Sequence, residues 1–218
     1  LSMDLSEKRL FAVSDGAGGC AKGEVASALT VSTLFGNLEQ IKNSDTEEML
    51  NNALDEANSN VVSFFEKEGN IGIATVSGLL FENNKVKVFN AGDSPVYLIE
   101  DGIMEHLSRE HTLSGKSGYG KKSIAANTIT RYMGNSEVPG SEAVYSATTD
   151  ISAGMIFIIA SDGVEKGLSE NQIKRVSMKK RSNVAETLVK RAEKNGVEDD
   201  ITAIVIKISE DDFITESE

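Results

Sequence analysis

Four short apolar runs joined by tight turns occupy the middle of the chain. The runs span residues 73–81, 85–91, 96–99 and 103–107. Asn83-Asn84 and Asp101-Gly102 separate neighbouring runs, and two-residue connections of this kind are typical of β-hairpins. Because hairpins pair consecutive strands in opposite directions, the centre of the chain is predicted to be an antiparallel sheet.

Helical patterns lie on both sides of these strands. One begins at about Glu24, and a clearer apolar stripe follows at Leu50, Ala53, Leu54, Ala57, Val61, Phe64 and Phe65. Further strands are predicted at 10–13, 143–147, 155–160 and 201–208, and helices near 170–179 and 184–195. Helices that cover a largely antiparallel sheet predict an α+β layered domain. We expect one domain over residues 1–209 and a frayed acidic tail over 210–218.

The charge balance restricts the classes of partner. Thirty-four acidic and 22 basic side chains give a formal net charge of −12, the wrong sign for a surface that follows nucleic-acid phosphates. No apolar run approaches the ~20 residues that span a bilayer, so no membrane partner is expected. Cys20 is the only cysteine, which excludes a disulfide framework and fits a reducing, cytoplasmic setting.

Three aspartates stand at the ends of predicted strands. Asp15 and Asp162 each follow an apolar run and precede a glycine, and Asp199 precedes the last run. A single Asp-Gly after a strand is ordinary turn chemistry. Three such carboxylates, two of them beside a glycine that lets the backbone approach a ligand, favour a site for a hard cation such as Mg²⁺ or Mn²⁺.

Five motifs in order resemble those of the metal-dependent protein phosphatases, the PPM or type 2C family. They are Leu10–Gly19 with the following Gly23–Ser27, then Asn90–Ser94, Asn127–Gly134, Ala160–Val164 and Asp199–Thr202. The resemblance covers residues 10–208. It implies a four-layer α-β-β-α sandwich of two mainly antiparallel sheets flanked by helices.

The resemblance also implies the site and its chemistry. Asp15 would bridge two Mn²⁺ or Mg²⁺ ions with help from the Gly16 carbonyl, and Asp162 and Asp199 would complete one ion's ligands. Asp93 with Asp162 would form a weaker third site. A metal-activated water would then hydrolyse phosphoserine or phosphothreonine in protein substrates. A cognate serine/threonine kinase is the implied counterpart.

Several positions depart from the family pattern. Asp200 stands where the family usually has asparagine, and Cys20 where bacterial members often carry histidine. Pro95 follows the Gly92-Asp93-Ser94 motif, where the family often has arginine. The family's upstream arginine and acidic motif have no match in this sequence. We therefore expect the natural protein to continue upstream, and this chain to bind one metal ion well and the second poorly.

Other reactive residues have ordinary explanations. Cys20 is expected to be a small neighbour of the site, and His106 to have a surface or core role. For His111 a structural hydrogen bond is expected. Arg131 has the right charge for phosphate, but a buried pair with a carboxylate is the more common role of such a residue.

Three competing interpretations remain open on sequence alone. Residues 16–21 match a G-x-G-x-x-A dinucleotide fingerprint with Glu39 downstream. Residues 115–122 nearly spell a phosphate-binding loop, but Lys122 replaces the hydroxyl residue that binds Mg²⁺. The third alternative is a non-catalytic regulatory module with the phosphatase fold.

Overall fold

A computed structural model describes residues 2–5, 8–17, 22–40, 45–113, 128–180 and 182–212. The strands are β1 (Ser2–Leu5), β2 (Lys8–Val13), β3 (Val76–Glu82), β4 (Lys85–Ala91), β5 (Val96–Glu100), β6 (Ile103–His106), β7 (Tyr145–Asp150), β8 (Ile156–Ala160) and β9 (Ala203–Lys207). The helices are α1 (Gly23–Gln40), α2 (Thr46–Lys67), α3 (Gly140–Ala143), α4 (Asp162–Gly167), α5 (Glu170–Ser177) and α6 (Val184–Lys194).

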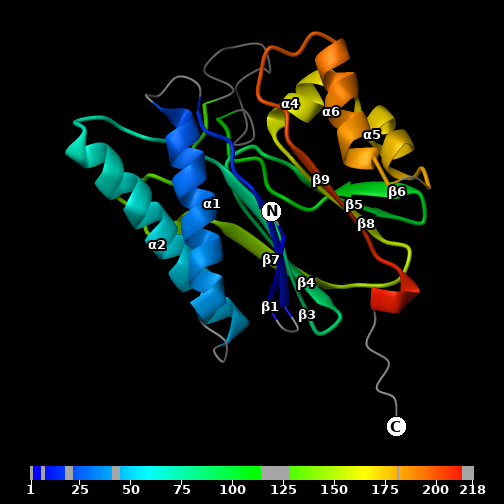
Figure 1. The fold of residues 1–218 in the computed structure, drawn as a ribbon, viewed down its shortest axis with the longest axis horizontal. Coiled ribbons are helices and arrows are strands. Elements are labelled where there is room, and N and C mark those ends of the chain that lie inside the picture. The colour runs from blue at the N-terminus through cyan, green and yellow to red at the C-terminus, as the bar shows by residue number, and fades with distance from the viewer. Residues whose placement is uncertain are drawn as a thin grey trace.

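The strands form two sheets, in the orders β1-β2-β3-β4-β7 and β6-β5-β8-β9. Every strand pair in the described ranges is antiparallel. Figure 1 shows α1 and α2 on one side of the molecule and α4, α5 and α6 on the other. The predicted α-β-β-α sandwich is therefore confirmed. Because β2 has antiparallel neighbours on both sides, it is not the first strand of a dinucleotide-binding βαβ unit.

Alternation along the central strands separates the apolar layers. On β5, Val96 and Leu98 face the cluster between the sheets, whereas Tyr97 and Ile99 face α4–α6. On β8, Phe157 and Ile158 divide in the same way. A third cluster joins the other face of the first sheet to α1 and α2. Strands buried on both faces explain why these segments are continuous apolar runs in the sequence.

The predicted turns and helix stripe agree with the structure. Asn83, Asn84 and Asp101 have positive φ angles of 48°, 58° and 49°, as tight hairpin turns require. The stripe on α2 is buried, apart from the half-buried Phe64. Leu50, Ala53 and Leu54 belong to the cluster with the first sheet, and Val61 and Phe65 pack with Ala26 and Ala74. None of the described helices is long and apolar enough to cross a membrane.

Two predicted boundaries were wrong. The strand expected at 143–147 is β7 at Tyr145–Asp150, because Gly140–Ala143 forms a helical turn packed against α2. The strand expected from residue 73 begins at Val76, because Ala74 makes isolated bridges to Gly16 and Met133 instead. The short helix α4, which the sequence did not indicate, follows β8 directly.

The predicted acidic tail begins in ordered structure. Glu210–Asp212 form a 3-10 helix, in which the Asp212 carboxylate accepts hydrogen bonds from the Ser209 N–H at 2.8 Å and the Ser209 hydroxyl at 2.6 Å. Asp212 also contacts Arg9 Nη1 at 3.3 Å. Residues 213–218 lie outside the described part of the chain.

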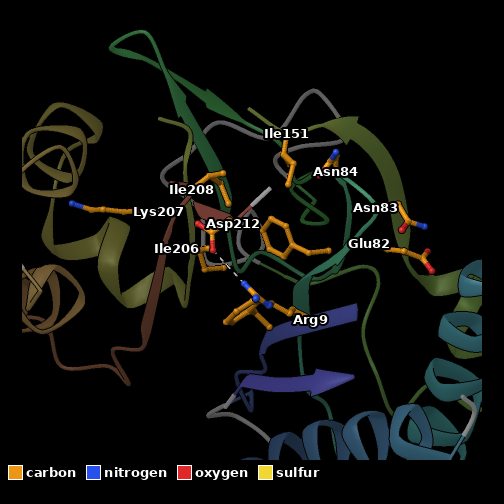
Figure 2. Close-up of a pocket in the computed structure, with 11 residues that line it drawn as sticks. Arg9, Glu82, Asn83, Asn84, Ile151, Ile206, Lys207, Ile208 and Asp212 are labelled. Carbon is orange, nitrogen blue, oxygen red and sulfur yellow. Dashed lines mark hydrogen bonds and ion pairs between the residues drawn. The ribbon is translucent and has the colours of Figure 1, made fainter. Parts of the chain in front are cut away.

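A cavity of about 180 Å³ opens near the start of β2 and the end of β9. Figure 2 shows Ile151, Ile206 and Ile208, which line it, and the ion pair between Arg9 and Asp212, which line it as well. The predicted site residues Asp15 and Asp199 adjoin the opposite ends of these same two strands. This cavity is therefore at the other end of the sandwich from them.

Candidate metal centre

The two sheets bring the four predicted site aspartates together. Asp15 follows β2, Asp93 lies between β4 and β5, Asp162 begins α4 directly after β8, and Asp199 precedes β9. The negative charges of the other three all act on the Asp15 carboxyl. Aspartates from positions 15 to 199 thus form one carboxylate cluster, defined here as Asp15, Asp93, Asp162 and Asp199.

Thr75 fixes the backbone at Asp15. The Asp15 N–H donates to Thr75 Oγ1 at 2.9 Å, and the Thr75 N–H donates to the Asp15 carbonyl at 2.7 Å. The Ser14 hydroxyl donates to the Thr75 carbonyl at 2.5 Å. A Cβ on Gly16 would lie 2.0 Å from the Gly23 carbonyl oxygen, so only glycine fits where this loop meets α1.

The same threonine is linked to the turn that carries Asp93. Thr75 Oγ1 lies 2.7 Å from Ser94 Oγ, and both residues are almost fully buried. On the other side of the turn, the His111 N–H donates to the Gly92 carbonyl at 3.0 Å, and the Gly92 N–H donates to His111 Nδ1 at 3.3 Å. The structural hydrogen bond expected of His111 is therefore confirmed.

Ser161 holds the other two aspartates in a comparable way. Its hydroxyl donates to the Asp200 carbonyl at 2.8 Å and accepts from the Thr202 N–H at 3.0 Å. Ser161 directly precedes Asp162, and Asp200 directly follows Asp199. One buried hydroxyl thus fixes the loops that carry both carboxylates.

Replacing Thr75 with valine should destabilise the fold. Valine has nearly the same shape, but it leaves the Asp15 N–H and the buried Ser94 hydroxyl without this partner. We expect the free energy of unfolding to fall by about 1–3 kcal/mol. Urea denaturation of the variant measures this change.

Thr30→Val is the matched control. Thr30 is also fully buried, but its hydroxyl donates only to the Ala26 carbonyl within α1, at 2.8 Å. Equal losses of stability in the two variants would contradict a special role for Thr75.

The cluster is electrostatically costly in the absence of a cation. Burial raises the pKa of Asp15 to about 7, and repulsion from Asp162, Asp199, Asp200 and Asp93 adds to the effect. Burial, followed by repulsion from Asp162, raises the pKa of Asp93 to about 6. A bound divalent cation would remove this repulsion, and carboxylate oxygens are the ligands that Mg²⁺ and Mn²⁺ prefer.

One lysine already lies among these carboxylates. Lys166 Nζ is 2.6 Å from Asp162 Oδ2 and also donates a hydrogen bond to Asp199 Oδ2. Partial burial opposes ionisation of Asp199, but the hydrogen bonds from Lys166 and the Asp200 N–H lower its pKa overall. The lysine was missed in the sequence because its signal, a position four residues after Asp162, has meaning only on a helix.

The oxygen ligands and negative charge of the cluster suit a hard divalent cation, but the carboxylates are widely spaced. In the described ranges, no three Asp, Glu, His or Cys side chains lie close enough together to form a ready cation cage. Asp162 and Asp199 are connected through Lys166 instead. The roles predicted for Asp15, Gly16, Asp93, Asp162 and Asp199 as metal ligands therefore stay predictions.

A cavity of about 640 Å³ opens beside the cluster. Asp93, Asp162 and Lys166 line one part of it, and His106, Arg109 and Glu165 line another. Its Glu165 accepts a hydrogen bond from the Tyr97 hydroxyl and lies 3.8 Å from His106 Nε2. Burial, with repulsion from Glu170 and Asp93, raises the pKa of Glu165 to about 7. His106, which was expected in an ordinary role, thus lies on the wall of this cavity.

The remaining predicted residues are placed elsewhere or not described. Arg131 is exposed, so the expectation of a buried pair was wrong. Cys20, with Gly18 and Gly19 before it, and the phosphate-loop-like residues 115–122 lie outside the described ranges.

Comparisons with known proteins agree with the fold. The sequence model of the family described as protein phosphatase 2C matches residues 2–205. The chain is similar to the serine/threonine phosphatase stp of Listeria innocua, with 26% identity over 212 residues, 89% of this chain and 82% of the relative. It is equally similar to the serine/threonine protein phosphatase PstP of Mycobacterium tuberculosis, covering 94% of this chain but only 41% of that protein.

Solved structures show the same architecture. The catalytic domain of PstP in complex with two manganese ions has a TM-score of 0.79 and 25% identity, over 92% of this chain and 88% of that one. PppA of Pseudomonas aeruginosa also has a TM-score of 0.79, with 27% identity over 91% of this chain and 85% of that one. The match of the family model over almost the whole chain shows that this protein belongs to the protein phosphatase 2C family.

Proposed function

We propose that this chain is a metal-dependent protein serine/threonine phosphatase that hydrolyses phosphoserine and phosphothreonine by means of a metal-activated water. The observation that carries the proposal is the carboxylate cluster. Its aspartates lie near the ends of strands from both sheets, and buried hydroxyl groups hydrogen-bond to the loops that contain them. The names of its relatives and the two manganese ions bound to one of them support the same interpretation.

Each carboxylate has a proposed task. Asp15, with the Gly16 carbonyl, would hold two ions together, and Asp162 and Asp199 would complete the ligands of one of them. Asp93 would share a weaker third ion with Asp162. When bound, Mn²⁺ or Mg²⁺ supplies a nucleophile by lowering the pKa of a water and neutralises the charge of the phosphate.

Other residues of the protein hold the proposed metal ligands in position. Thr75 orients Asp15 through the backbone, and Ser161 holds the loops of Asp162 and Asp199 in register. Rigid support of this kind matters because small displacements of ligands reduce metal affinity and turnover. The adjoining cavity of about 640 Å³ gives a phosphorylated side chain access to the cluster. A serine/threonine kinase that phosphorylates the same substrates is the proposed counterpart.

Phosphate release from phosphoserine and phosphothreonine peptides, and from p-nitrophenyl phosphate, tests the proposal. Turnover should require Mn²⁺ or Mg²⁺, stop on addition of a chelator and resume when excess metal is restored. Metal binding by calorimetry without turnover of any of the three substrates would instead favour the non-catalytic module. Turnover that persists in chelator would contradict the metal-dependent mechanism.

A further inference from the structure

We propose that Lys166 is a built-in competitor of the metal ion: its ammonium group occupies the position between Asp162 and Asp199, and a divalent cation has to displace it. The inference rests on the proposed function, because it takes these two aspartates as metal ligands. It adds a residue that sets how tightly the chain binds its metal.

The geometry places one ammonium group between two carboxylates that are far apart in the sequence. Lys166 is four residues after Asp162 on α4, so its side chain returns to the start of the helix, where Nζ is 2.6 Å from Asp162 Oδ2. The same Nζ donates to Asp199 Oδ2, which belongs to the segment before β9. The lysine therefore joins two elements that a shared metal ion would otherwise join.

The two carboxylate oxygens of Asp199 have different partners. Its Oδ1 accepts the Asp200 N–H at 2.9 Å, and this local bond fixes the orientation of the carboxylate. Its Oδ2 faces Lys166. A cation that binds Oδ2 must approach the position of the ammonium, and two positive groups cannot share it without strong repulsion. Metal binding at Oδ2 of Asp199 thus requires the lysine to leave.

The displaced Lys166 side chain can move into the neighbouring cavity. This side chain is 48% exposed and lies on the wall of the cavity of about 640 Å³. A lysine ammonium on a flexible four-carbon stem can move into that space without disturbing the backbone of α4. Displacement therefore costs the two contacts and little else.

Lys190 offers a matched control within the same chain. It pairs with Glu186, also four residues earlier on a helix, but it is exposed on α6, and the carboxylates that act on its charge are Glu186 and Glu193. Removal of either lysine deletes one positive charge and one helical ion pair. Only Lys166 contacts two proposed metal ligands.

Calorimetric titration with Mn²⁺ of wild type, Lys166→Met and Lys190→Met tests the inference. Methionine keeps the length of the stem but cannot compete for carboxylate oxygens. We expect Lys166→Met to bind Mn²⁺ about tenfold more tightly, which corresponds to about 1.4 kcal/mol. Lys190→Met should bind like wild type. The metal-free Lys166→Met protein should melt at a lower temperature, because the cluster has lost its internal cation.

The outcomes separate the two proposals. If wild type binds Mn²⁺ and Lys166→Met binds no more tightly, the competition is overturned while the phosphatase proposal stands. If neither protein binds Mn²⁺, the metal centre itself is wrong.

A measurement on wild type avoids any effect of substitution on folding. Amine acetylation followed by mass spectrometry reports how free each lysine is. Addition of Mg²⁺ should increase labelling of Lys166 several-fold and leave Lys190 unchanged. Unchanged labelling of Lys166 under conditions where calorimetry shows Mg²⁺ bound would overturn the displacement.

Discussion

Asp15→Asn should lower phosphatase turnover by more than about 100-fold while leaving the metal-free fold at least as stable as wild type. Loss of a group that only supports a metal ligand typically costs 10–100-fold, so loss of the proposed bridging ligand should cost more. Asparagine has nearly the same volume as aspartate, and the Asp15 N–H that Thr75 binds belongs to the backbone. Turnover of p-nitrophenyl phosphate with Mn²⁺ measures the first effect.

The stability of this variant should depend on pH in a particular direction. The folded-state pKa of Asp15 is raised from 3.8 to about 7, so ionisation of Asp15 opposes folding. Wild type therefore loses stability as the pH rises from about 4 to 7, and the asparagine variant lacks this loss. In metal-free buffer the variant should melt higher than wild type at pH 8, and the two should converge near pH 4.

Asp212→Asn is the control: it makes the same chemical change, but its expected effect on stability at pH 8 is the opposite. Hydrogen bonds from Ser209 lower the pKa of Asp212, so its ionised form stabilises the fold at neutral pH. Its neutralisation should reduce stability at pH 8 and leave turnover unchanged, because it lies at the far end of the sandwich. An Asp15→Asn protein with wild-type turnover would refute the proposed site.

Gly16→Ala should strongly destabilise the fold. The new Cβ would lie 2.0 Å from the Gly23 carbonyl oxygen and 2.2 Å from its carbon, and backbone atoms cannot move aside as a flexible side chain can. We expect a loss of about 3 kcal/mol in the free energy of unfolding, seen as a lower urea midpoint. Turnover should also fall, because the shift displaces Asp15 and the Gly16 carbonyl.

Gly36→Ala tests whether the effect belongs to the position. Gly36 lies in α1, and a Cβ added there would have no atom within 4 Å, so alanine should stabilise the protein by up to about 1 kcal/mol. Equal stability of the Gly16 variant and wild type would show that the loop can relax, and the close-packing argument would fail.

Much of the fold could be predicted from the sequence because its signals are local. The hairpin turns at Asn83-Asn84 and Asp101-Gly102 and the stripe on α2 depend on neighbouring residues only. The segments that were misplaced are decided by contacts at long range. Residues 140–143 pack on α2, and α4 is bounded by Asp162-Gly163 and Gly167, residues that taken alone indicate a turn.

The aspartates of the candidate site could be named from the sequence, but the residues that support them could not. Asp-Gly at the end of an apolar run is visible in the sequence, and the resemblance supplied the rest. The roles of Thr75 and Ser161 depend on partners 60 and 39 residues away. The second partner of Lys166 is 33 residues away. No periodicity or motif connects residues at such distances, so only the folded structure reveals them.

The chain passes between the two sheets three times, after β4, after β6 and after β7. Neither sheet is therefore made from a continuous stretch of sequence, and neither can be completed until the chain has passed through the other. Such long-range pairing predicts slow folding and a single cooperative transition. Strand β9 is the last strand of the second sheet and is preceded by Asp199. On the ribosome, the carboxylate cluster therefore cannot assemble until nearly the whole domain has been synthesised.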